Sequence, residues 1–246
     1  MRISKAWIVA AKDIKVFFRK RYTVYSLVVF PVIIGIGLPF VLRFLIARQG
    51  AALGSHLTDV MNAFAFFFAI GASIIPSTLA AYSLVGEKVE KSLEPLLAAP
   101  ITDGELLLGK GIASFVPSVV SLYIGSIVFM VFSDLVTHNF LGYYFFPNWH
   151  IAIILLVSIP LMTVLSVEWC VIVSARATDP RAAQLQGILI AIPLAVIYVA
   201  TEVGAVTLNT TTIWIISGVI LIFDIILFFL STRTFQREEI LTKWTQ

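Results

Sequence analysis

Six stretches of apolar residues, each long enough to cross a bilayer as a helix, constrain this chain more than any other feature. A spanning helix satisfies its backbone hydrogen bonds internally, which hydrocarbon demands. The chain is 59% hydrophobic and 13% charged, whereas soluble domains are about 45–50% apolar and about 25% charged. We therefore expect an all-α polytopic membrane protein, one domain over residues 1–246, and exclude a soluble enzyme or a disordered chain. The expected spans are Val24–Ile46, Val60–Val85, Ile112–Phe132, Ile151–Val173, Leu185–Thr201 and Ile213–Leu230.

Lysine and arginine are distributed unequally between the two sides of these spans. Fifteen of the 17 basic residues fall in the N-terminal segment, the second and fourth connections and the C-terminal tail, and only Arg43 and Arg48 fall on the other side. Basic loops stay cytoplasmic, so both termini are predicted to be cytoplasmic, in a multi-pass protein of the cell membrane. The single cysteine, Cys170, excludes an internal disulfide and a cysteine-based metal cage, and we expect no metal site.

Residues 1–22 precede the first span and have the period of an amphipathic helix. Lysines and an arginine lie on one arc, opposite a mostly apolar arc. We expect this helix to lie in the headgroup region and to contact a partner or another part of the chain. A basic flank that only sets topology is the alternative. The apolar arc carries Ile3, Trp7, Ala10, Ile14, Phe17 and Phe18, and the basic arc Lys5, Lys12, Lys15 and Arg19.

The connection at residues 86–101 has an unusual order of charge, leucine and proline. Five charged residues occupy eight positions from Glu87 to Glu94. Glu87 and Lys91 are spaced to stabilise a short helix, and Pro95 and Pro100 prevent a continuous one. The pattern indicates a rigid elbow that docks into another surface, and a solvated loop is the alternative.

This connection resembles the signature turn of the ABC type 2 transporter family, the export-type permeases. A glycine-lysine pair leading into the third span is similar too, as is the C-terminal tail, residues 232–246. The resemblance implies that the turn is a coupling helix on a separate ATPase subunit, and that two permeases work as a pair. The matching positions are Glu87, Glu90, Ser92, Leu93, Glu94, Leu96, Leu97, Pro100, Ile101, Gly109 and Lys110.

The family resemblance also implies site residues. ATPase-docking residues would be Glu87, Lys88, Glu90, Lys91, Ser92, Leu93, Glu94, Leu96 and Leu97. In that family, spans two and five line the translocation pathway. In this sequence the two spans carry few charged residues, which favours an amphipathic or apolar cargo. The resemblance to exporters implies that the cargo moves outward. The pathway residues would be Ser73, Ser77, Thr78, Tyr82, Gln186, Pro193, Tyr198, Thr201 and Glu202. We expect Pro193 to be the most probable hinge among the span prolines.

The sequence contains no motif that predicts an ATPase site in this chain. Residues 104–111 approach the phosphate-loop spacing, but Gly111 stands where a serine or threonine would bind magnesium, and three leucines fill the loop. We therefore expect a transport subunit without catalytic residues, with ATP and magnesium bound by the partner ATPase. A net charge of +3 gives no reason to expect nucleic acid as a partner.

Two acidic residues, Glu168 and Asp224, fall within spans four and six. Acids in hydrocarbon are costly and indicate function by default. They could pair with Arg176 or Arg233, contact the substrate, or carry protons. The last possibility defines the alternative function, a proton-coupled secondary transporter.

Overall fold

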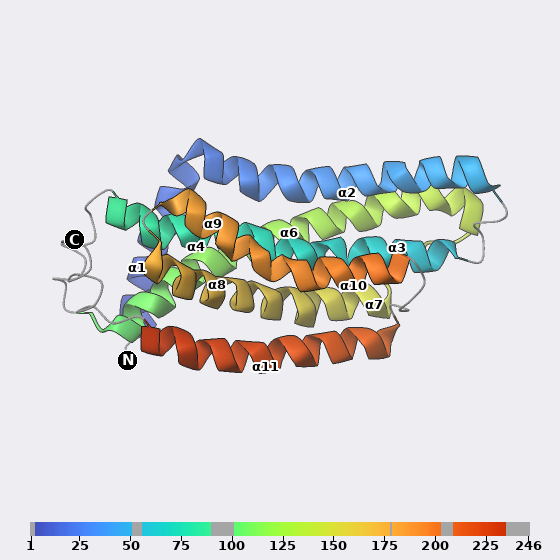
Figure 1. Ribbon diagram of the computed structural model, residues 1–246. Helices are drawn as coiled ribbons and strands as arrows, with labels where there is room; N and C mark the ends of the chain where they lie inside the picture. The colour runs from blue at the N-terminus through green and yellow to red at the C-terminus, as the bar shows by residue number, and fades with distance from the viewer. Residues whose placement is uncertain (1–2, 51–55, 90–100, 178, 203–208, 235–246) are drawn as a thin grey trace.

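The computed structural model describes residues 3–50, 56–89, 101–177, 179–202 and 209–234, and every regular element in those ranges is helical (Figure 1). Six segments are long and apolar enough to span a membrane. The predicted all-α architecture with six spans is therefore confirmed for the part of the chain described. The spans are Thr23–Arg48, Leu57–Ser83, Gly104–Leu141, Trp149–Ser174, Pro180–Ile197 and Thr210–Ser231.

Several spans consist of more than one helical element. In chain order the elements are α1 (Ile3–Arg19), α2 (Arg21–Gln49), α3 (Leu57–Ala65), α4 (Phe67–Val89), α6 (Asp103–Leu141), α7 (Trp149–Ile153), the π-helix η2 (Ile154–Ser158), α8 (Ile159–Arg176), α9 (Pro180–Ile188), the 3₁₀ turn η3 (Leu189–Ala191), α10 (Ile192–Glu202) and α11 (Thr210–Thr234).

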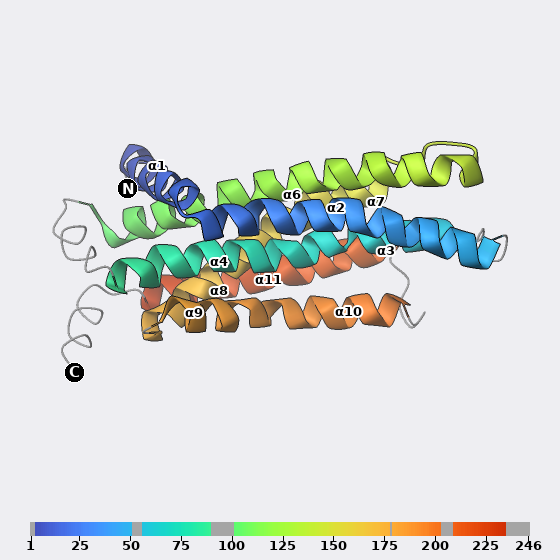
Figure 2. The ribbon, with the colours of Figure 1, turned by 90° about the horizontal axis from the view of Figure 1, so that it is seen from above.

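The long helices run side by side as a bundle, and α1 lies at one end of it, tilted across the long helices (Figures 1 and 2). At that same end α4, α8 and α11 finish and α6 and α9 begin (Figure 1). We call it the basic end, because the connections and termini that carry most of the lysines and arginines belong to it.

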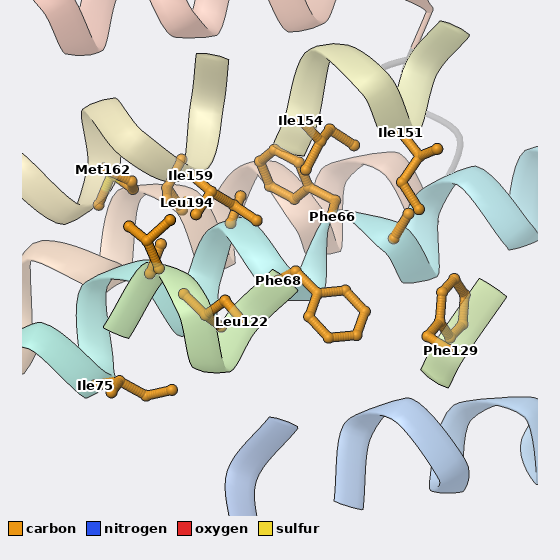
Figure 3. Packing of buried hydrophobic residues seen from close by; sticks show 14 of the residues in the cluster. Phe66, Phe68, Ile75, Leu122, Phe129, Ile151, Ile154, Ile159, Met162 and Leu194 are labelled. Carbon is orange, nitrogen blue, oxygen red and sulfur yellow. The ribbon is translucent and has the colours of Figure 1, made fainter. Parts of the chain in front are cut away.

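The span formed by α3 and α4 is the centre of the bundle. In the most apolar stretch of this span, 83% of the residues are buried inside the protein. The same fraction is 22% for the span built on α2 and 22% for the span built on α9–α10. Phe66 and Phe68 pack there with Phe129 of α6 and Ile154 of η2 (Figure 3). The outer spans keep large apolar side chains exposed, as lipid requires.

Helix α1 is amphipathic as predicted, but its buried face is rotated from the expected one. Ala6, Val9, Ala10, Asp13 and Phe17 are buried, and the helix packs chiefly on α6. Of the predicted apolar arc, Ile3, Trp7 and Phe18 remain exposed. Ala10 and Phe17 of the arc are buried, together with Ala6 and Val9 beside it, and these mostly small residues allow close contact with α6. The exposed apolar residues of α1 remain available to the headgroup region.

Helix α6 is much longer than the expected span. It has 39 residues, or about 58 Å at the rise of an α-helix, whereas the hydrocarbon core is about 30 Å thick. Thr102 caps its first turn, with its side chain accepting from the Glu105 amide and the Glu105 carboxylate accepting from the Thr102 amide. The helix therefore extends beyond the expected span, Ile112–Phe132, at both ends, and Lys110 is buried within the bundle in its N-terminal part.

Two spans change helix type immediately before a proline. The π-helix η2 precedes Pro160, and the 3₁₀ turn η3 precedes Pro193. Proline has no N–H, so it leaves the carbonyl of the residue four positions earlier without its helical partner. Those carbonyls belong to Leu156 and Leu189, which lie in η2 and η3 themselves. A hinge at Pro193 stays a prediction, but the break in helix type lies there.

Helices α2 and α6 approach closely at a pair of glycines. A Cβ atom on Gly35 would lie 2.7 Å from the carbonyl oxygen of Gly125, and a Cβ on Gly125 would overlap Pro31. Small residues that bring backbones together are a main source of helix association in membranes. Gly37, two residues along α2, has no neighbour within 4 Å of such a Cβ.

We predict that Gly35→Ala destabilises the protein and that Gly37→Ala does not. Both substitutions remove a helical glycine and raise helix propensity, but only the first forces α2 and α6 apart, at a cost of about 1–3 kcal/mol. Thermal unfolding of the purified variants in the same detergent measures the difference. Equal melting temperatures would contradict the close contact.

Candidate functional site

Three polar side chains from three helices meet inside the basic end of the bundle. Asp13 of α1, Ser83 of α4 and Lys110 of α6 are only 4%, 4% and 2% exposed. We call them the Asp13–Ser83–Lys110 cluster. They are separated by tens of residues in the chain, so the fold alone brings them together.

The cluster is fully hydrogen-bonded. The Lys110 ammonium donates to the Ser83 carbonyl oxygen at 2.7 Å and to the Ser83 hydroxyl at 3.2 Å. That hydroxyl donates to Oδ2 of Asp13 at 2.6 Å, and the ammonium lies 3.5 Å from the same oxygen. Lys12 adds a second, more exposed cation 3.8 Å from Oδ1 of Asp13. Breaking such a buried pair leaves an uncompensated charge, which costs about 3–5 kcal/mol.

Gly109 allows α1 to reach the cluster. A Cβ atom on Gly109 would lie 2.6 Å from the carbonyl oxygen of Ala6 and 2.8 Å from Cβ of Val9. The glycine-lysine pair of the sequence therefore has two separate roles. Gly109 admits the backbone of α1, and Lys110 binds the acid that α1 carries.

Residues 104–111 form the first turns of α6 and not a phosphate loop. Their backbone has helical geometry, and the ammonium of Lys110 hydrogen-bonds to Ser83 and Asp13. Within the described ranges, no three His, Cys, Asp or Glu side chains are grouped so that they could hold a metal ion.

The cluster brackets the predicted coupling turn. Ser83 lies six residues before Val89, where α4 ends, and Lys110 lies eight residues after Thr102, the cap of α6. Of the predicted docking residues, Glu87 and Lys88 lie in the last turn of α4. The other seven fall in residues 90–100, outside the described ranges: Glu90, Lys91, Ser92, Leu93, Glu94, Leu96 and Leu97.

The predicted pathway residues of the second span lie inside the subunit. Ser73 and Ser77 are fully buried. The hydroxyls of Ser77 and Ser166 are 2.7 Å apart, and the Ser166 hydroxyl donates to the Ser73 carbonyl oxygen at 2.7 Å. Thr78 accepts a hydrogen bond from the Gln184 side chain of α9 at 3.0 Å, and Tyr82 is half-buried. These hydroxyls join α4 to α8 and α9.

The predicted pathway residues of the fifth span follow one another along its helix. Gln186 is exposed and precedes Gly187, which packs against Ser77. Pro193 is exposed, and Tyr198, Thr201 and Glu202 lie farther along α10. The pathway assignment stays a prediction that depends on a second subunit.

A groove of about 560 Å³ opens between α8, the η3–α10 segment and α11. Its lining is apolar, and the indole N–H of Trp169 donates to the Gln186 carbonyl oxygen at 3.0 Å. Pro193 is the one predicted pathway residue in it. The groove is lined by Met162, Leu165, Trp169, Leu189, Ile190, Pro193, Leu194, Ile197, Ile215, Ile216, Val219, Ile220, Phe223 and Leu227.

Sequence reasoning identified Gly109 and Lys110 but missed Asp13 and Ser83. A usable signal existed for the acid: Asp13 is the only acidic residue among the first 50 and belongs to an otherwise basic helix. Its position on the small-residue face of α1 also pointed inward. For Ser83 no sequence signal distinguishes it from the other serines of the span.

Comparison with known protein families gives a match over most of the chain. The family model described as ABC-2 family transporter protein matches residues 7–214. A comparison with curated proteins gave no match. The matched range includes all three members of the cluster.

We predict that Asp13→Asn and Lys110→Met each lower stability by about 3 kcal/mol, because each leaves a buried charge without its counterpart. The double variant should recover more than half of the summed loss. Denaturant unfolding in detergent measures this cycle, with Lys15→Met, on the exposed face of α1, as the control. Strictly additive losses would contradict a direct pairing.

Proposed function

Because the chain belongs to the ABC-2 family of transporter proteins, we propose that it is the permease of an ATP-driven exporter. The proposed cargo is an amphipathic or apolar molecule, which moves outward across the cell membrane. A separate ATPase subunit binds ATP and magnesium. A second permease, identical or related, completes the membrane part.

The Asp13–Ser83–Lys110 cluster is the observation that carries this proposal. It joins the helix that leads into residues 90–100, the helix that follows them, and α1. A displacement of the segment between Val89 and Thr102 is therefore passed to three helices at once. Such a firm attachment suits a segment that receives force from a partner, whereas a solvated loop would not need it.

The basic end is proposed to face the cytoplasm, where a soluble ATPase and its nucleotide are found. The unequal distribution of lysine and arginine supports this orientation. Exposed apolar side chains on α2, α10 and α11 remain available to lipid and to the second permease.

We predict that cysteines at positions 15 and 56 are labelled from opposite sides. Lys15 and His56 are exposed at opposite ends of the bundle, and the native Cys170 is buried and should not react. An impermeant maleimide added to intact cells should label His56→Cys, and should label Lys15→Cys only after permeabilisation. Labelling of both in intact cells would refute the topology.

A pull-down from native membranes should recover an ATPase of the ATP-binding cassette type together with this chain. In the reconstituted complex, we predict that Glu94→Ala with Leu97→Ala lowers ATPase stimulation and export by about tenfold, as the loss of an interface anchor does. The melting temperature should not change. Tyr144→Ala, exposed at the other end of the bundle, is the matched control.

The same reconstituted system separates the two candidate functions. An ATP-driven exporter transports without a proton gradient and stops when the ATPase is inactivated. A proton-coupled transporter behaves in the opposite way. Transport that survives ATPase inactivation and fails when the gradient is collapsed would overturn the proposal.

A further inference from the structure

Two acidic side chains, one on α8 and one on α11, have no hydrogen-bond partner among the residues that the structure describes. Asp224 is 6% exposed, and both of its carboxylate oxygens are buried without a hydrogen bond. Oε2 of Glu168 is in the same condition. The helices that carry the two acids pack directly on each other.

Asp224 is an exception among the buried acids of the described residues. Asp13 is paired in its cluster, Glu105 closes the capping box of α6, and Asp134 accepts from the amides of Phe145 and Phe146. Elsewhere on the same interface, the hydroxyls of Ser158 and Ser217 lie 2.9 Å apart and satisfy each other. A buried polar group that stays unsatisfied in hydrocarbon requires an explanation.

The basic residues suggested as internal partners lie more than two helical turns from the acids along the same helices. Arg176 lies eight residues after Glu168 on α8, and Arg233 lies nine residues after Asp224 on α11. These separations are about 12 Å and about 13 Å along the helix axes. Lys110 is bound within its own cluster, and Arg48 stacks on Phe44 at the other end of α2.

The apolar groove borders the same two helices. Trp169 is the next residue after Glu168, and Phe223 is the residue before Asp224; both line the groove. Its volume of about 560 Å³ is within the usual range for small-molecule sites. Because the Trp169 N–H is already bonded, the groove has nothing to attract an anion or a polar neutral molecule.

We propose that the groove and the Glu168–Asp224 pair form a binding site for a lipophilic cation. The hydrocarbon part occupies the groove, and the positive group reaches the carboxylates between α8 and α11. Charge complementarity favours this ligand, since a buried carboxylate that stays ionised needs a positive partner. As a cargo site this inference rests on the proposed export function, but the binding itself does not.

Binding of tetraphenylphosphonium tests the site, with tetraphenylborate as an anion of the same shape. Equilibrium dialysis uses the full chain in phosphatidylcholine nanodiscs, without ATPase or nucleotide, against empty nanodiscs. The cation should bind saturably, and the anion should not exceed the empty discs. Asp224→Asn and Glu168→Gln should each weaken cation binding by about tenfold or more, as expected for the loss of a close charge interaction.

Two controls keep the test specific. Asp59→Asn removes an exposed acid at the opposite end and should leave binding unchanged, and Leu194→Trp should block the groove without touching the acids. Should Asp224→Asn fail to fold, Glu168→Gln decides alone, because Glu168 is only half-buried.

Equal binding of cation and anion, or unchanged cation binding in both acid variants, would overturn the proposal. The proposal would also be overturned if the acid variants dissociated the two permeases while cation binding stayed intact. That result would show that the two acids pair with a basic residue of the second copy. Saturable cation binding, together with transport that survives ATPase inactivation in the reconstituted system, would refute the export function and leave the site standing.

Discussion

In hydrocarbon, apolar side chains gain little from packing on one another in place of lipid, so helices associate through close backbone contact and interhelical hydrogen bonds. This bundle relies on both. Gly35 and Gly125 bring α2 and α6 together, and the Ser166 hydroxyl of α8 donates to a carbonyl of α4. At the basic end a buried ion pair performs the same task for α1. Each of these contacts fixes a position along the helices, which smooth apolar surfaces could not do.

The number and location of the spans follow from the sequence because the length of an apolar run is set by the bilayer. The ends of the spans do not follow as well. The glycine-lysine pair was expected to lead into the third span, and the helix in fact begins earlier, at Asp103, and buries Lys110 beside Asp13. The packing face of α1 does not follow from hydrophobicity either, because alanine and glycine contribute little hydrophobicity but permit the closest contact, as at Ala6 and Gly109.

For the candidate sites too, the sequence indicates which residue types matter but not which residues they contact. Sequence identified Glu168 and Asp224 as costly acids, but only the three-dimensional arrangement shows that Asp224 has no hydrogen-bond partner among the described residues, while Asp13 and Asp134 have theirs. The family resemblance predicts that the serines of the second span line a pathway. In the subunit their hydroxyls bond to α8, and residue type alone does not distinguish the two roles.

The unbroken length of α6 has a mechanical consequence. Its contact with α2 at Gly125 lies 15 residues from Lys110 and 16 residues from Leu141, about 22 Å and about 24 Å along the axis. A rigid rod that turned about this contact would move its two ends by similar distances in opposite directions. Pro117 lies between this contact and Lys110, and it is the place where that rod can bend.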